Sequence, residues 1–257
     1  MVKIKMDLEK EREIVKMSKT ESTDKIKILK SSIDAPMRYL KAEWRGIPED
    51  KFFNIPIDIE PTVEFNNVME MVSETDIPNL ELVKEDHPNL TQVCQEFDWT
   101  NPPFDILKFS LGLVKTMRDL NGLGLAANQV GVPYRIFCVR SDPNKVLINP
   151  RIIVLGTEQI ILEEGCLTFP SLWIKIKRSR HLKVRYEMPN QETITETYTG
   201  MTARIIQHEL DHLDGILFFN RASRYHKDQA FKRRNKFLKE LNNGRVYDGS
   251  PEADRIS

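Results

Sequence analysis

Apolar residues between positions 201 and 219 recur at the spacing of an α-helix. A helix here would carry apolar residues on one side and a mixture of apolar and ionisable residues on another: Ala203, Ile206, Leu210 and Leu213 on the first, and Ile205, His208, Glu209 and His212 on the second. Apolar residues on both sides predict that this helix is buried. Its polar side chains must therefore find partners inside the protein.

Shorter patterns predict the elements around this helix. The spacing of apolar positions predicts an amphipathic helix over 104–121 and a second one over 227–241. Between these helices, runs of β-branched and alternating residues predict strands at 134–140, 146–148, 151–155, 159–162, 173–177, 182–188 and 192–199. Strands and helices grouped in blocks predict an α+β fold, with mostly antiparallel sheets around the central helix and a C-terminal helix.

The chain divides into three parts that differ in composition and in the spacing of apolar residues. Residues 1–79 are rich in charge and broken by prolines 48, 56, 61 and 78, with a hint of one short strand at 25–29. They contain no chemical motif, so we interpret them as an accessory extension of unknown role. Residues 80–242 form the predicted catalytic domain. Residues 243–257 are polar and punctuated by glycine and proline, which predicts disorder.

Composition excludes several classes of protein. The 257 residues are 40% hydrophobic and 30% charged with a formal net charge of zero, and no apolar run approaches the roughly 20 residues of a membrane span. Neither a membrane nor DNA is therefore expected as a partner. The first residues lack a signal core and are too acidic for a transit peptide. Three cysteines are too few for a disulfide framework, so the sequence predicts a cytoplasmic protein.

The central helix contains the pattern His-Glu-x-x-His. His208 and His212 are four residues apart, so their imidazoles would lie on one face and could hold one metal ion. Glu209 would lie beside them, where a carboxylate can take a proton from water. A catalytic metal needs a third protein ligand, which helical geometry does not identify. The candidates are Cys166, Glu164, Asp211, Asp214 and the remaining histidines, whereas Cys94 and Cys138 fit small buried apolar residues.

A glycine-rich loop follows the first predicted helix. Residues 122–131 lack the glycine spacing of a nucleotide-binding loop and follow a helix rather than a strand, so a nucleotide site is rejected. The glycines could simply end the helix. The small residues that precede Gln129, however, predict a slim backbone that something approaches closely.

Three motifs stand in order along the chain: GLGLAANQ at 122–129, EGCLT at 164–168 and QHELDHLDG at 207–215. Together they resemble the signature motifs of the peptide deformylase family, and the resemblance extends over roughly residues 81–241. It implies that Cys166, His208 and His212 hold one divalent metal ion. The native metal of the family is Fe2+, often replaced by Zn2+, Ni2+ or Co2+, and the donor set does not choose among them.

The resemblance also implies a reaction. N-formylmethionyl nascent peptides would be the substrates, and formate and a free amino terminus would be the products. A metal-bound water would attack the formyl carbon, and Glu209 would move the proton from this water to the departing amine. The side-chain amide of Gln129 and the backbone N–H of Leu167 would stabilise the oxyanion.

A pocket for methionine is expected beside the metal. Its lining candidates are Met201, Ile205 and Trp173, each of which could instead be ordinary core. The peptide backbone would lie extended along the loop that contains Leu123 and Gly124, by added β-pairing.

The last predicted helix is strongly basic. Between residues 221 and 239 a single acid, Asp228, stands against Arg224, Lys227, Lys232, Arg233, Arg234, Lys236 and Lys239. The plain interpretation is a solvated face. The resemblance implies contact with ribosomal RNA near the exit of nascent chains, and such contact should weaken with salt.

Two other functions compete with deformylation. Another His-Glu-x-x-His enzyme would cut internal peptide bonds and would take a downstream carboxylate or histidine, rather than Cys166, as its third ligand. A binding module without activity would need neither Glu209 nor Gln129. Formate release from a formylated peptide, compared with digestion of casein, separates these functions.

Overall fold

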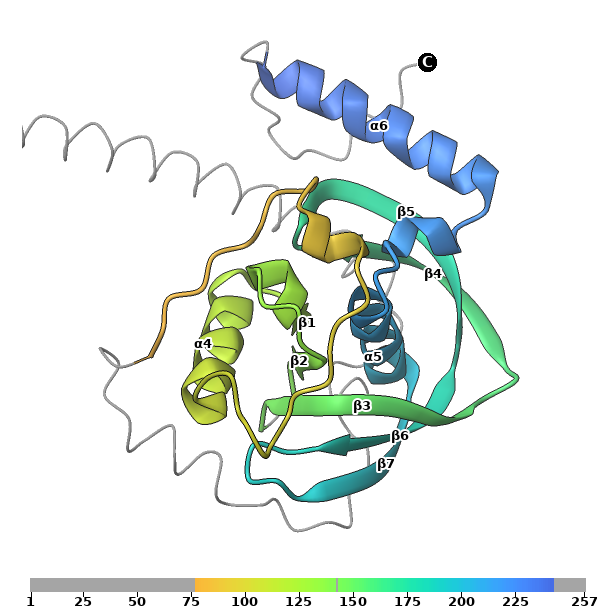
Figure 1. The fold of residues 1–257 in the computed structure, drawn as a ribbon. Helices are drawn as coiled ribbons and strands as arrows, with labels where there is room; N and C mark the ends of the chain where they lie inside the picture. The colour runs from red at the N-terminus through yellow and green to blue at the C-terminus, as the bar shows by residue number, and fades with distance from the viewer. Residues whose placement is uncertain (1–76, 142, 243–257) are drawn as a thin grey trace, which may run out of the picture. The chain divides into compact units, whose positions relative to one another are not determined.

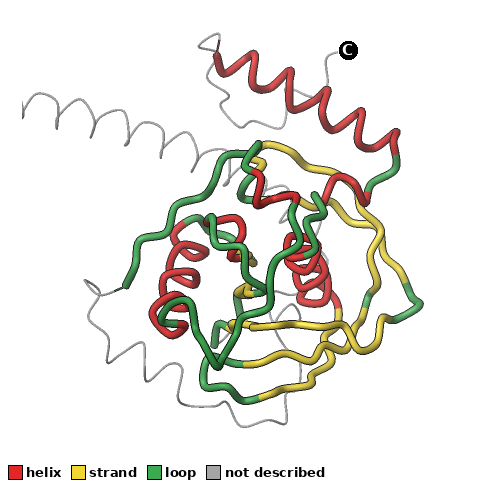
Figure 2. Tube along the Cα trace, viewed as in Figure 1, coloured by secondary structure: helices red, strands yellow, loops and turns green. Residues whose placement is uncertain are grey.

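The computed structural model describes residues 77–141 and 143–242 (Figure 1). The predicted strand at 25–29, almost all of the extension 1–79 and the tail 243–257 lie outside these ranges. Figure 2 shows how helices and strands alternate with connecting loops. The helices are α4 at Ile106–Asp119, α5 at Gly200–Leu213 and α6 at Arg224–Asn242, with short 3-10 turns η2 at Pro88–Thr91, η3 at Ala127–Val130 and η4 at Phe218–Arg221.

The strands form two antiparallel sheets. They are β1 at Gly124–Ala126, β2 at Ile136–Val139, β3 at Lys145–Leu155, β4 at Gln159–Cys166, β5 at Phe169–Ser179, β6 at His181–Glu187 and β7 at Thr193–Thr199. One sheet has the order β1-β2-β3-β6-β7, so β1 lies at an edge, and β4 and β5 form a two-stranded sheet. The α+β prediction with antiparallel sheets and a C-terminal helix is therefore confirmed.

Helix α5 is the centre of the arrangement, as the sequence predicted. It contacts β1, β2, β5, β6 and β7. In Figure 1 the strands β3, β6 and β7 run past one side of α5, and the hairpin of β4 and β5 curves past another. A helix enclosed by both sheets can present its polar side chains only to buried partners.

The predicted apolar run of 201–219 is helical only as far as Leu213. Gly215 adopts φ +68°, a left-handed conformation that ends helices and that favours glycine. A Cβ at Gly215 would also lie 2.7 Å from the backbone oxygen of Thr91. The last two apolar residues of the run, Phe218 and Phe219, instead belong to the separate turn η4, where Phe218 is buried.

The two strands predicted at 146–148 and 151–155 form one strand, β3. Asn149 and Pro150 separate the two predicted strands. Strand β3 instead continues through these two residues. Asn149 adopts φ +49°, and the register of β3 against β6 shifts there. The side chain of Asn149 stabilises this bend because its Oδ1 accepts from the backbone N–H of Phe97 at 2.8 Å.

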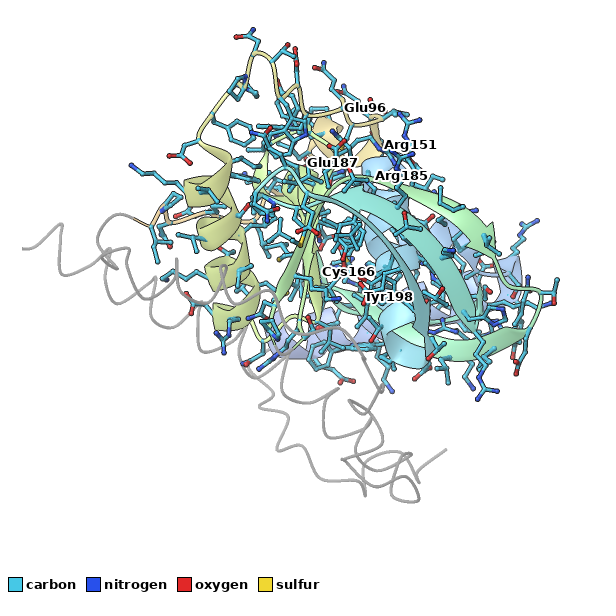
Figure 3. All side chains as sticks on the ribbon, turned by 90° about the horizontal axis from the view of Figure 1, so that it is seen from below. Glu96, Arg151, Cys166, Arg185, Glu187 and Tyr198 are labelled. Carbon is cyan, nitrogen blue, oxygen red and sulfur yellow. The ribbon has the colours of Figure 1, made fainter. Side chains whose placement is uncertain are left out.

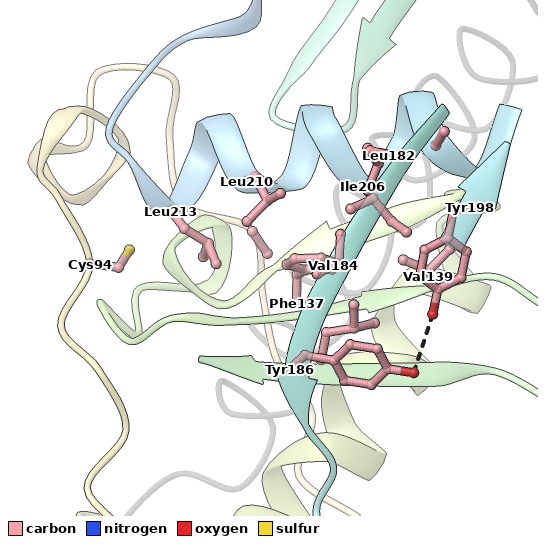
Figure 4. Close-up of a cluster of buried hydrophobic side chains, with 13 residues drawn as sticks. Cys94, Phe137, Val139, Leu182, Val184, Tyr186, Tyr198, Ile206, Leu210 and Leu213 are labelled. Carbon is pink, nitrogen blue, oxygen red and sulfur yellow. Dashed lines mark hydrogen bonds between the residues drawn. The ribbon is translucent and has the colours of Figure 1, made fainter. Parts of the chain in front are cut away.

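Buried side chains of α5 pack on the sheet below it. Ile206, Leu210 and Leu213 lie in one cluster with Phe137 and Val184, as Figure 4 shows. Full burial of such side chains contributes about 1.5–3 kcal/mol each. This packing fixes the rotation of the helix, and with it the direction of the residues on its other side.

No helix in the described ranges is both long enough and apolar enough to cross a membrane.

Candidate metal and catalytic site

Helix α5 brings its two histidines and one glutamate into the interior. His208, Glu209 and His212 are 7%, 4% and 1% exposed, and the two imidazole centroids are 5.1 Å apart. Gln207 fastens the same turn of the helix to β5, because its Nε2 donates to the carbonyl of Ser179 at 2.9 Å and its Oε1 accepts from the N–H of that residue. The histidines are therefore held in place by the helix and by a strand.

Cys166 reaches the histidines from the hairpin of β4 and β5. Cys166 pairs with Phe169 across a two-residue turn, and its half-buried side chain is labelled near the middle of Figure 3. Its Sγ lies 3.3 Å from Nε2 of His212. One ligand atom each from Cys166, His208 and His212 lie within 4.8 Å of one another. Among the candidates for a third donor, the structure brings Cys166 to the two imidazoles.

Two of the other third-ligand candidates have different partners. Asp211 accepts hydrogen bonds from Arg178 at 2.7 Å and from Arg221 at 2.7 Å. Asp214 is exposed at the end of α5 and pairs with Arg135 at 2.7 Å. Both carboxylates are therefore paired with arginines, and neither belongs to the group formed by the thiol and the two imidazoles.

Glu164 belongs to a buried network behind the histidines. It accepts from Arg178 at 2.7 and 2.9 Å and from Arg204, and its Oε2 lies 3.1 Å from Nδ1 of His208. Burial raises the pKa of Glu164, but hydrogen bonds from His208 and Arg178 outweigh it and hold the pKa well below its usual range. An ionised Glu164 accepts the Nδ1 proton of His208 and leaves Nε2 for a metal.

The arginines of this network were not identified from the sequence, although a signal was present. Ile174 and Ile176 are buried, and the lysines between and after them are exposed. Arg178 continues the buried parity of this strand, which places a guanidinium in the interior. A buried guanidinium requires acidic partners, and Glu164 and Asp211 provide them.

The three donor side chains suit a divalent transition metal. A thiolate and two imidazoles are a donor set for Fe2+, Zn2+, Ni2+ or Co2+. Burial, followed by the nearby charge of His208, lowers the pKa of His212 well below its usual value, so this imidazole is neutral as a ligand must be. Burial lowers the pKa of His208, but hydrogen bonds with Cys166 and Glu164 raise it to about 10. The surroundings of His208 therefore favour a positive charge beside it, which a cation bound at Nε2 would supply in place of a proton.

Glu209, which lies between the two histidines in the sequence of α5, has a buried carboxyl group with few polar partners. It is buried, and its Oε2 has no hydrogen-bond partner among the described residues. Burial raises the pKa of Glu209 to about 7, against the lowering effects of His208 and Arg178. A carboxyl with this pKa both accepts and releases a proton near neutrality.

The glycine loop at 122–131 leaves no room for side chains at two of its glycines, because Glu209 and Leu167 lie against its backbone. A Cβ at Gly124 would overlap Oε1 of Glu209 and would lie 2.8 Å from Cγ2 of Ile205. A Cβ at Gly122 would lie 2.7 Å from Cδ1 of Leu167. The close approach expected from the sequence is thus made by the protein's own catalytic candidates.

Gln129 reaches the same centre from η3. Its Oε1 accepts from the N–H of Ala126 at 2.8 Å, which turns Nε2 toward Sγ of Cys166 at 3.3 Å and Oγ1 of Thr168 at 3.0 Å. Leu167 lies in the turn between Cys166 and Thr168, so its backbone is next to the thiol. Thr168, the last residue of the EGCLT motif, helps to orient the amide.

The candidate pocket residues occupy different places. Ile205 lies beside Gly124, and Met201 is half-buried one turn earlier on α5. Trp173 packs its indole on Gly165 of β4, where a Cβ would lie 2.9 Å from the ring. Leu123, half-buried, precedes the edge strand β1 and accepts from the N–H of Arg140 through its carbonyl at 2.8 Å.

A thiol and two imidazoles that could hold one metal ion, next to a buried glutamate, are typical of a metal-dependent hydrolase. A sequence model described as polypeptide deformylase matches residues 79–228. The chain belongs to the peptide deformylase family.

Individual relatives agree with this placement. The chain is 42% identical over 112 residues to the peptide deformylase of Thermotoga petrophila, covering 43% of this chain and 68% of that protein. It is 39% identical over 150 residues to that of Desulforudis audaxviator, covering 57% and 96%. Two solved structures resemble the fold. The deformylase of Synechococcus elongatus in complex with actinonin has a TM-score of 0.57 at 29% identity, covering 62% of this chain and 87% of that one. The deformylase of Thermotoga maritima has a TM-score of 0.53 at 33% identity, covering 57% and 99%.

Proposed function

We propose that this chain removes the formyl group from the N-terminal formylmethionine of nascent polypeptides and releases formate. The observation that carries this proposal is the convergence of Cys166, His208 and His212 beside Glu209 and Gln129. Membership of the deformylase family favours this reaction over the cleavage of internal peptide bonds.

Cys166, His208 and His212 hold one divalent metal ion in this proposal, natively Fe2+, with Zn2+, Ni2+ or Co2+ as substitutes. When bound, such an ion lowers the pKa of a water ligand and polarises the formyl oxygen. Glu164 keeps the imidazole of His208 oriented through the contact of 3.1 Å with Nδ1.

Glu209 moves the proton in this proposal. Its carboxylate accepts a proton from the attacking water as the new C–O bond forms at the formyl carbon. The same proton then passes to the amine nitrogen as the C–N bond breaks. The pKa of about 7, raised by burial, supports both steps near neutral pH because the carboxyl then gains and loses its proton with similar ease.

Gln129 and Leu167 stabilise the oxyanion that forms between these steps. Nε2 of Gln129 is held near the thiol by Ala126, Thr168 and Cys166, and the backbone N–H of Leu167 lies in the adjoining turn. Loss of one donor of this kind typically raises the barrier by about 2.7–4 kcal/mol.

The substrate lies along the edge strand β1. An edge strand has free backbone groups, so an extended peptide can add to it next to Leu123 and Gly124. The methionine side chain is received by Met201 and Ile205, with Trp173 on the hairpin side. The position of Ile205 beside Glu209 and Gly124 supports its part in this pocket.

Helix α6 provides contact with the ribosome in this proposal, and the chain works in the cytoplasm. The basic residues of α6 do not all serve the same purpose, because Arg234 pairs with Glu85 and donates to the carbonyl of Pro170, and Arg233 donates to that of Trp173. Lys232 and Lys236 are exposed on the same helix. These two lysines are the better candidates for contact with phosphates.

Formate release from formyl-Met-Ala-Ser by anaerobically purified protein, with metal analysis, tests the function. Glu209→Ala should keep the metal and lose turnover, and Cys166→Ala should lose the metal. Cys94→Ala is the matched control, because it removes another buried thiol that is not among the three grouped donors. Digestion of casein without formate release, or full activity of Glu209→Ala, would refute the proposal.

A further inference from the structure

Asn128 joins two parts of the site without touching the donor atoms. Its side chain is fully buried, and its Nδ2 donates to the carbonyl of His212 at 2.6 Å and to the carbonyl of Asn89 at 3.1 Å. Carbonyl oxygens only accept hydrogen bonds, so this arrangement fixes which end of the amide faces them. Both protons of one NH2 group are therefore committed to backbone carbonyls.

The two parts that Asn128 joins each carry a residue of the proposed reaction. Asn128 precedes Gln129 in η3, and the carbonyl that it binds belongs to His212 in the last turn of α5. The carbonyl of His212 accepts from the N–H of Gly215 at 3.2 Å where the helix ends, and a carbonyl oxygen can accept from a second donor. Asn128 supplies that second donor from another segment, so a single side chain links the turn of Gln129 to the end of the histidine helix.

Packing alone does not account for an asparagine at this position. Its Oδ1 is buried with no hydrogen-bond partner among the described residues. Burial of an amide oxygen without a partner costs free energy that an apolar side chain would not. What the amide provides is its pair of donors, and these point to the two carbonyls.

We propose that Asn128 is a positioning residue that sets the distance between Gln129 and the metal ligand His212. This inference rests on the proposed function, since it assigns those two residues their roles. Asn128 acts only through them: its link keeps η3 against the end of α5, so that the amide of Gln129 and the imidazole of His212 face one centre. Outer partners of this kind typically change metal affinity or activity about 10–100-fold.

The test compares Asn128→Ala with Asn89→Ala. Asn89 donates from its own Nδ2 to the carbonyl of Gly131 at 2.9 Å, so its removal also deletes an amide-to-carbonyl hydrogen bond at η3. It leaves the link between Asn128 and His212 in place. Two quantities are measured in each variant: the rate at which a chelator removes Co2+ from the loaded protein, and kcat and KM separately for formyl-Met-Ala-Ser.

Asn128→Ala should release Co2+ about 10–100-fold faster than the wild type and lower kcat by a similar factor, with KM changed less than about threefold. Asn89→Ala should leave both quantities near the wild-type values, even where urea unfolding shows a similar loss of stability. Equal release rates and equal kcat in the two variants would overturn the inference and leave Asn128 with a role in stability alone.

A milder variant covers the case in which Asn128→Ala does not fold. Asn128→Ser retains one hydroxyl donor and should give intermediate Co2+ release, whereas a wild-type rate would overturn the inference. Failure of the proposed function is seen separately, as absence of formate release from the wild-type protein. The Co2+ comparison still decides in that case, because it does not depend on turnover.

Discussion

Arg178 and Glu164 form a buried two-point ion pair, with guanidinium-to-carboxylate distances of 2.7 and 2.9 Å, and Glu164 contacts Nδ1 of His208 in turn. Arg178 also donates to Asp211 at 2.7 Å. Strand β5 is thereby connected to the histidine that Glu164 contacts and to Asp211 of α5. The orientation of His208 depends on this pair.

Arg178→Leu should destabilise the protein by about 3–5 kcal/mol, because it leaves the carboxylates of Glu164 and Asp211 buried with fewer partners. Urea unfolding of the metal-free protein measures the change. Arg180→Leu is the control, since Arg180 pairs with Glu158 at the surface, where both side chains are more than half exposed. This variant should be destabilised by less than about 1 kcal/mol. Equal destabilisation of the two variants would contradict the proposed importance of the buried pair.

Gly124→Ala should lower kcat for formyl-Met-Ala-Ser at least ~100-fold, because displacement of a catalytic group by about 1 Å has effects of this size. The added methyl group would overlap Oε1 of Glu209 and push against Ile205. Metal content should stay near one ion per chain, because neither residue is among the three donors. A variant with wild-type kcat would show that Glu209 does not need its present position.

Glu196 gives stability a dependence on pH that does not involve the metal site. Burial raises the pKa of Glu196, but hydrogen bonds from Lys145 and Tyr198 outweigh it, and the pKa lies below its usual value. The Nζ of Lys145 is 2.7 and 2.8 Å from the two carboxylate oxygens, and Figure 4 shows the neighbouring hydrogen bond between Tyr186 and Tyr198.

A carboxyl group with a lower pKa in the folded state stabilises the protein above its unfolded pKa, about 4.3, and loses this effect as the pH falls through the folded pKa. Glu196→Gln should therefore reduce the free energy of unfolding by about 1–3 kcal/mol at pH 7. The difference from the wild type should shrink as the pH falls below about 4.3. Urea unfolding at pH 7 and pH 3.5 measures both, and a difference that stays constant with pH would contradict the assignment.

Charge reversal on α6 tests the proposed ribosome contact. Lys232→Glu combined with Lys236→Glu should weaken cosedimentation with ribosomes at low salt and reduce the dependence of log K on log salt by about 1 for each phosphate that a lysine no longer neutralises. Lys108→Glu, on the exposed face of α4, is the control and should bind as the wild type does. Salt-insensitive binding of the wild type would argue against contact with RNA. The formate assay should be unaffected in all of these variants.

The local elements were predictable because they depend on neighbouring residues. The period of the apolar residues identified α5, and the spacing of His208 and His212 placed both imidazoles on one face before any fold was known. The helix ended earlier than its apolar run because Gly215 takes a left-handed conformation next to Thr91, a contact between distant segments. The sequence pattern does not contain that contact.

The rest of the site could not be predicted from the sequence pattern, because it depends on how distant segments pack against one another. The motif resemblance implied that Cys166 joins the histidines, but spacing alone left five kinds of candidate open, because a hairpin can approach a helix in many ways. The sequence did not separate Glu164 and Asp211 from the possible metal ligands, because their shared partner Arg178 lies on another segment of the chain. Asn128 gave no signal at all, since both of its partners are backbone atoms of remote residues.

The tight reversal that joins β4 to β5 has one further result. Cys166 and Leu167 are adjacent in a hairpin whose last pair is Cys166 and Phe169. A shift of the Cys166 backbone would therefore also move the backbone N–H of Leu167. If Cys166 binds the metal and the N–H of Leu167 stabilises the oxyanion, as proposed, a change that moves the sulfur to suit a larger or smaller ion would also move that donor. Metal preference and rate would then be coupled through one peptide unit, and substitutions that separate them would have to be made on helix α5.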